Sequence, residues 1–61
     1  MKRQVIRIRT KKDGRTVLNA RVKQDVTLAA ACELIKNEVD SGYADYGVVT
    51  IDGEIYEEME A

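Results

Sequence analysis

Two Asp-Gly pairs, each lying between β-branched stretches, constrain the fold of this chain more than any other feature. The first, Asp13-Gly14, separates residues 5–10 from 16–22, and the second, Asp52-Gly53, separates residues 46–51 from 54–57. Asp-Gly between roughly alternating apolar residues is a strong short-range signal for a β-hairpin. The sequence therefore predicts a hairpin toward each end of the chain.

The register of the first hairpin can be tested against its side-chain pattern. A two-residue loop would place Ile8 opposite Asn19, which mixes core and solvent positions. A three-residue loop over 12–14, with its glycine left-handed in a bulge, places Ile8 beside Leu18. We therefore predict the three-residue loop, with one apolar and one polar face. The apolar face holds Ile6, Ile8, Leu18, Ala20 and Val22, and the other holds Arg7, Arg9, Val17, Asn19 and Arg21.

The register of the second hairpin stays open. A two-residue loop groups Val49 with Ile51 and Tyr56, whereas a three-residue loop groups Val49 with Ile55. Neither choice gives an unbroken apolar face. Residues 58–61 are rich in glutamate, so we expect them to fray as an acidic tail.

Residues 28–40, between the hairpins, are good helix formers. Asp25 or Thr27 is the expected N-cap, and Ser41-Gly42 is the expected C-terminal stop. At 100° per residue the apolar side chains form one stripe, which should face the core. That stripe holds Leu28, Ala31, Cys32, Ile35 and Val39.

These elements predict a single α+β domain over residues 1–61, with the order ββαββ. Two hairpins form one four-stranded sheet, and the helix packs on one face of it. We favour the strand order 2-1-4-3. The alternative, with the third strand beside the first and the glutamate-rich fourth strand as a protected edge, stays open.

The order of elements, with Asp25-Val26-Thr27-Leu28 opening the single helix between two hairpins, resembles small β-grasp modules. Two groups share this order, the ubiquitin-like proteins and the bacterial immunoglobulin-binding domains. The resemblance implies that the first and fourth strands lie side by side and parallel in the centre of the sheet. The chain ends in residues 57–61 without the terminal Gly-Gly that conjugating ubiquitin-like proteins use, so conjugation is not expected.

The composition argues against catalysis and against a bound cofactor. With one cysteine and no histidine among 61 residues, the chain can form neither an internal disulfide nor the usual zinc ligand sets. Cys32 lies in an apolar helical run, so we expect a small buried hydrophobe rather than a reactive thiol. No segment has the apolar length of a membrane span or of a signal-peptide core, so we expect a cytoplasmic protein.

The charges are strongly polarised along the chain. Up to Gln24 there are nine cations and one carboxylate, and after it one cation and ten carboxylates, so the halves carry +8 and −9 within a net charge of −1. In one interpretation, Arg7 or Arg9 pairs with Glu54 or Glu57 inside the molecule. In the other two, a charged surface binds either a protein, which includes a second copy of this chain, or a nucleic-acid backbone.

We expect a small non-enzymatic protein-binding module, of the kind that regulates or inhibits a larger macromolecule. Stand-alone chains of this type are typical of phage and mobile-element accessory proteins. The alternative is a nucleic-acid-binding module that uses the basic first hairpin, but that hairpin face carries no aromatic side chain on which bases stack. The candidate binding residues are Arg7, Arg9, Lys11, Lys12, Arg15, Arg21, Tyr43, Tyr46 and Tyr56.

Overall fold

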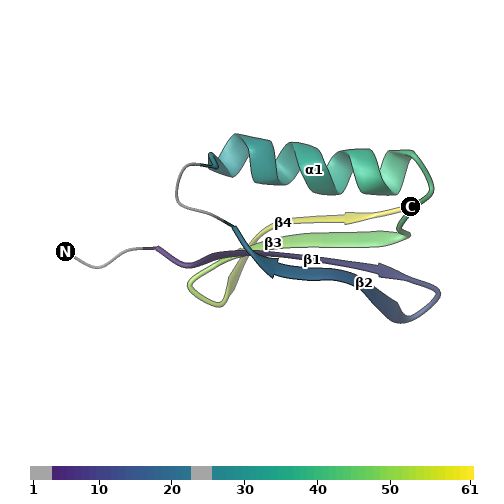
Figure 1. Cartoon of the computed structure of the whole chain (residues 1–61), viewed down its shortest axis with the longest axis horizontal. Helices are drawn as coiled ribbons and strands as arrows, with labels where there is room; N and C mark the ends of the chain where they lie inside the picture. The colour runs from purple at the N-terminus through teal and green to yellow at the C-terminus, as the bar shows by residue number, and fades with distance from the viewer. Residues whose placement is uncertain (1–3, 23–25) are drawn as a thin grey trace.

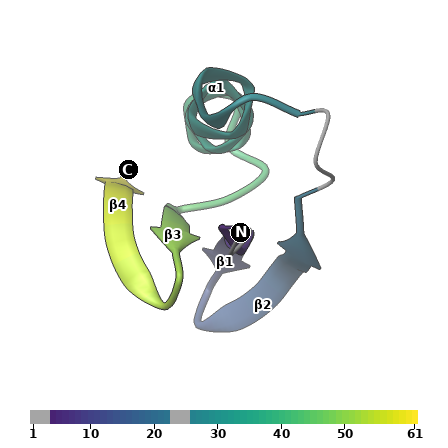
Figure 2. The same ribbon diagram turned by 90° about the vertical axis from the view of Figure 1, so that its left-hand side faces the viewer.

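A computed structural model of the chain describes residues 4–22 and 26–61. The elements follow the order β1 (Ile6–Lys12), β2 (Arg15–Arg21), α1 (Leu28–Asp40), β3 (Tyr46–Ile51) and β4 (Glu54–Glu60). The strands form one antiparallel sheet, and α1 lies on one side of it (Figures 1 and 2). The predicted ββαββ α+β fold is confirmed. Within the described ranges, no helix is long and apolar enough to cross a membrane.

The strand order is β2-β1-β3-β4. The third strand therefore lies beside the first, as in the alternative that the sequence left open, and the favoured order 2-1-4-3 is corrected by exchanging β3 and β4. Both neighbours of β1 are antiparallel to it, unlike the parallel central pair that the β-grasp resemblance implies. The reason is burial: β3 carries the buried Val48 and Val49 and needs a central place, whereas β4 carries four glutamates that suit an edge.

Both hairpins close through two-residue loops, so the predicted three-residue loop of the first hairpin is wrong. The backbone φ is positive at both loop residues of each turn, with 52° and 78° at Asp13 and Gly14, and 51° and 86° at Asp52 and Gly53. This is the pattern of a type I′ turn, whose twist matches that of the flanking strands. Each return strand then holds an unpaired residue, at positions 17 and 56, where the register shifts.

The bulge at position 17 restores the apolar face that a plain two-residue loop would destroy. Ile8 lies opposite Ala20, two positions from the predicted partner Leu18. Because side chains alternate with a period of two, a slip of two residues changes the partners of residues 18–22 but leaves their side chains on the predicted faces. The predicted apolar face is thus confirmed: Ile8 is buried in the core, and Ile6, Leu18 and Val22 pack against it.

The helix begins and ends close to the predicted signals. The Thr27 Oγ1 accepts a hydrogen bond from the backbone N–H of Ala30, while Asp25 lies outside the described residues. Gly42 ends the helix with φ = 85°. Helix α1 packs over β3 and also contacts β1 and β4 (Figure 2). Ala31, Ile35 and Val39 of the predicted stripe are buried. Cys32 is half-buried against the core, and both burial and the nearby Glu57 raise the pKa of its thiol.

The predicted acidic tail is wrong, because β4 continues to Glu60. Met59 lies opposite Gly47 on the helix side of the sheet and packs against the core. Pairing with β3 and this one apolar contact hold Glu58 and Glu60 in a regular strand. Three residues expected in solvent therefore belong to the sheet.

Thr10 is the one polar residue among the buried side chains of the described chain, with no exposed surface and no hydrogen-bond partner for its Oγ1. A buried hydroxyl without a partner loses its hydration and gains nothing in return. We expect Thr10→Val to raise the free energy of unfolding by about 1 kcal/mol, measured by urea denaturation. Thr16→Val, at an exposed position, should change it by less than about 0.5 kcal/mol. An equal effect at both positions would contradict this account of Thr10.

Candidate interaction surface

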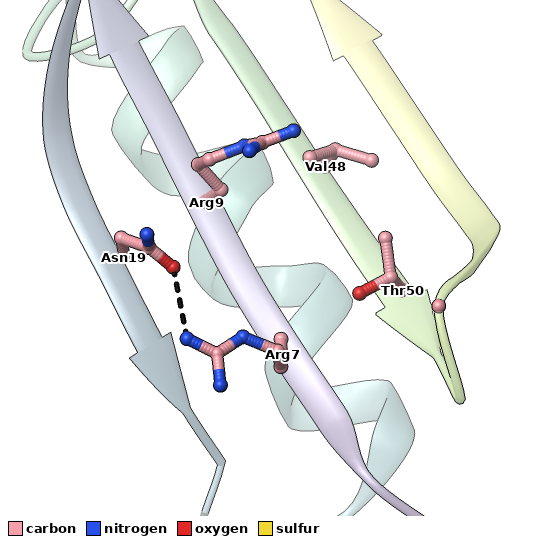
Figure 3. A pocket seen from close by; sticks show the side chains of 6 residues that line it. Arg7, Arg9, Asn19, Val48 and Thr50 are labelled. Carbon is pink, nitrogen blue, oxygen red and sulfur yellow. Dashed lines mark hydrogen bonds between the residues drawn. The ribbon is translucent and has the colours of Figure 1, made fainter.

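Most of the polar side chains of the four strands lie on the side of the sheet that faces away from α1. Figure 3 views this side, with α1 behind the sheet. Residues directly opposite one another in an antiparallel pair share a face, so the strand pairing shows which residues lie on this side. We call this surface the open face; it holds Arg7, Arg9, Lys11, Thr16, Asn19, Arg21, Tyr46, Val48, Thr50, Ile55, Glu58 and Glu60.

A shallow pocket of about 220 Å³ lies at the centre of the open face. The Arg7 guanidinium turns toward β2 and donates a hydrogen bond to Oδ1 of Asn19 over 3.3 Å, while Arg9 extends toward Val48 on β3 (Figure 3). The two guanidinium groups and the Thr50 side chain line the pocket. Guanidinium donors bind carboxylate and phosphate oxygens through charge-assisted hydrogen bonds, so the pocket suits an anionic group.

Arg7 lies directly opposite Arg21 on β2. Like charges at opposite positions of an antiparallel pair are destabilising by a few tenths of a kcal/mol to about 1 kcal/mol. On its other side Arg7 faces Thr50, and Arg9 faces Asn19 and Val48. The fold thus places each of these two arginines opposite a cation or an uncharged side chain.

The interpretation that Arg7 or Arg9 pairs with Glu54 or Glu57 inside the molecule is wrong. Strand β3 separates β1 from β4. Glu57 lies opposite the core residue Val49, on the helix side of the sheet. The predicted cross-strand pairs assumed that the first and fourth strands are neighbours, and the observed strand order removes that contact.

The open face also has one acidic border, and the valine at its centre is covered by neighbouring side chains. Val48 is only 2% exposed although it lies on the side of the sheet that faces away from α1. Beside it, Tyr46 donates a hydrogen bond to the Glu58 carboxylate. That bond raises the pKa of Tyr46, with smaller contributions in the same direction from burial and from the Glu58 and Glu60 charges, while Arg9 lowers it. Arg9, Tyr46 and Glu58 are therefore electrostatic neighbours.

The structure brings some of the predicted binding residues together and separates others. Lys12 and Arg15 lie opposite each other next to the first turn, on the helix side by strand alternation. Tyr43 is exposed in the turn after α1, and Tyr56 is exposed at the bulge of β4. The members that share the open face are Arg7, Arg9, Lys11, Arg21 and Tyr46.

Sequence reasoning missed the acidic border of this face. Glu58 lies opposite Val48, and Glu60 lies opposite Tyr46. Both were expected in a frayed tail, so no face was predicted for them. Alternation along the fourth strand contained the signal, but only a strand extended beyond Glu57 would have shown it.

The described part of the chain holds no group of three or more cysteine and carboxylate side chains that could bind a metal ion. Comparisons with protein-family models, with curated proteins and with solved structures found no match. The function is therefore inferred from the open face.

Proposed function

We propose that the protein is a small non-enzymatic protein-binding module that regulates or inhibits a larger macromolecule, and that the open face is its binding surface. The observation that carries the proposal is the pairing of Arg7 with Arg21 beside the arginine-lined pocket. This arrangement lowers the stability of the free chain. A carboxylate supplied by a partner would reduce the repulsion between Arg7 and Arg21, so binding would offset the loss of stability.

The signs of charge on the open face favour a protein over a nucleic acid. Glu58 and Glu60 border the same face as the arginines and would repel phosphates. Tyr46 lies on this face, but its hydroxyl is bonded to Glu58. Binders of single-stranded nucleic acid combine a continuous basic groove with aromatic side chains that stack on bases. A surface that carries both signs of charge is instead complementary to a protein surface.

The proposal is tested with a variant that removes the paired cations. The wild-type chain, an Arg7→Gln/Arg21→Gln variant and a Lys36→Gln control on the helix are immobilised and exposed to extract from the source cell. We expect a specific protein to bind the wild type and the control and to bind the double variant at least about tenfold more weakly when its affinity is then measured with purified components. Equal binding to all three chains would contradict the proposal.

The same three chains distinguish protein binding from the alternative, a nucleic-acid-binding function. Phosphate binding by lysine and arginine weakens steeply as salt concentration rises. We expect single- and double-stranded oligonucleotides to bind no more tightly to the wild type than to the double variant at either of two salt concentrations. Salt-sensitive binding that is lost in the double variant would instead favour the nucleic-acid-binding module.

A further inference from the structure

The open face is divided into a cationic and an acidic part along the strand order. The edge strand β2 and its neighbour β1 contribute Arg21, Arg7, Arg9 and Lys11, whereas the opposite edge strand β4 contributes Glu58 and Glu60. Residues that lie opposite one another across the four strands form a row. In the middle row of the open face, Arg9 lies between Asn19 and Val48, and Glu58 lies beyond Val48. A surface divided in this way is complementary to a copy of itself turned through 180°.

The edges of the sheet are poorly suited to pairing with another strand. Val17 in β2 and Tyr56 in β4 are bulged, and these are the two edge strands. A bulge bends and twists an edge, and together with charged side chains it opposes the addition of a further strand. Of the sheet's surfaces, the open face rather than an edge is therefore the one suited to association.

We propose that the open face binds a second copy of this chain, forming a two-fold symmetric sandwich in which the helices lie on the outside. The inference rests on the proposed function, because it takes the same open face as the binding surface and names a second copy of this chain as one protein that the face binds. Isologous two-fold contacts are the commonest in homo-oligomers, and sheets packed face to face keep their strands within about 30° of each other.

Charge selects between the two in-plane axes that such a dimer can have. An axis parallel to the strands places β2 over β4 of the other copy and β1 over β3 of the other copy. Glu58 of each copy then lies over Asn19 and the Arg7 and Arg9 pocket of the other. In this arrangement Arg9 of each copy lies over Val48 of the other, so the two Arg9 side chains are offset by one strand and each has Glu58 of the other copy on its opposite side. An axis perpendicular to the strands instead places Arg9 over Arg9 and Glu58 over Glu58, with no attractive contact in this row. Repulsion disfavours the second arrangement, so the first is the proposed dimer.

The parallel axis also covers an exposed hydrophobe. Ile55 is 61% exposed and shares a row of the open face with Thr50, Arg7 and Arg21. In the proposed dimer the aliphatic part of Arg21 lies over Ile55 of the other copy, and its guanidinium reaches water at the end of the interface. Burial of Ile55 and of the Tyr46 ring supplies apolar contact, while the Glu58 contacts fix the orientation.

The test uses opposite charge reversals on the two contacting residues. Sedimentation equilibrium is measured for the wild type, for Arg9→Glu, for Glu58→Arg, and for an equimolar mixture of the two variants. Each variant alone places like charges at both symmetric contacts, so its self-association should be weaker than that of the wild type by about tenfold or more. In the mixed dimer both contacts are attractive, so the mixture should associate about as tightly as the wild type. Lys36→Glu and Glu33→Arg, at exposed helix positions, are the matched controls and should dimerise normally.

A monomeric wild type, or a mixture that associates no better than its separate components, would overturn the proposed dimer. The dimer can fail while the proposed function holds: if the wild type is monomeric but a captured protein still depends on Arg7 and Arg21, the face binds a different protein. Equal capture by the wild type and the Arg7→Gln/Arg21→Gln variant would instead contradict the proposed function. Circular dichroism checks that each variant is folded. If a reversed chain does not fold, Arg9→Gln and Glu58→Gln replace it, and each should weaken self-association by a smaller factor than a reversal; unchanged self-association in both would also overturn the dimer.

Discussion

Ile35→Ala is expected to lower the free energy of unfolding by about 2–5 kcal/mol, the largest effect of any single substitution considered for this chain. Ile35 has no exposed surface and lies in the core cluster with Ile8, Ala31 and Val49. Removing its side chain beyond Cβ both exposes apolar surface and leaves a cavity that a rigid sheet cannot close. In a domain of 61 residues this is a large part of the total stability.

Urea denaturation of Ile35→Ala and of its neighbour Leu34→Ala checks this expectation. Leu34 is 40% exposed on the flank of the same helix, so its substitution removes a similar volume from a position that solvent already reaches. We expect a loss of less than about 1 kcal/mol there. Similar losses at both positions would mean that the apolar stripe of α1 is not what holds the helix on the sheet.

Gly47→Ala is expected to lower the free energy of unfolding by about 1–3 kcal/mol. A Cβ at Gly47 would lie 2.9 Å from Cβ of Ile35, and 3.6 Å from Cγ2 of Val39. Because the obstructing Ile35 atom is attached directly to the helix backbone, only a shift of α1 away from β3 relieves the contact. The backbone φ of Gly47 lies outside the left-handed region, so alanine is otherwise compatible with the strand.

Substituting asparagine at Gly47 and at Gly53 separates this packing effect from backbone strain. At Gly53 a new Cβ meets nothing within 4 Å, but φ is +86°. Asparagine tolerates that conformation, so Gly53→Asn should cost less than Gly53→Ala. At Gly47 the larger side chain should cost more than alanine. A Gly47→Asn variant as stable as the wild type in urea would contradict the close helix-to-sheet contact.

The sequence predicted the faces of the strands more reliably than their partners. Alternation placed Ile8 on the helix side and Arg7 on the open face, and both placements are confirmed. The same alternation cannot distinguish Leu18 from Ala20 as the partner of Ile8, because the two lie on one face. The missing information was the bulge at Val17, which lets a type I′ loop coexist with an apolar face.

Strand order was not determined by local pattern, because it depends on which strand needs burial on both sides. Val48 and Val49 are consecutive and both buried, which requires a central strand. That pair was visible in the sequence, but the β-grasp resemblance favoured β4 in the centre. The acidic border with Glu58 was missed for a related reason, since Met59 provides only one apolar side chain to show that β4 extends so far.

The central claim is that the open face is where this protein binds its partner. Backbone amide chemical shifts of the isotope-labelled chain test it most directly, measured over a dilution series and on addition of any captured protein. We predict that the shifts that change belong to Arg7, Arg9 and Val48, while those of Leu34 and Lys36 on the helix stay constant. Changes concentrated at Leu34 and Lys36, with Arg7, Arg9 and Val48 unaffected, would contradict the claim.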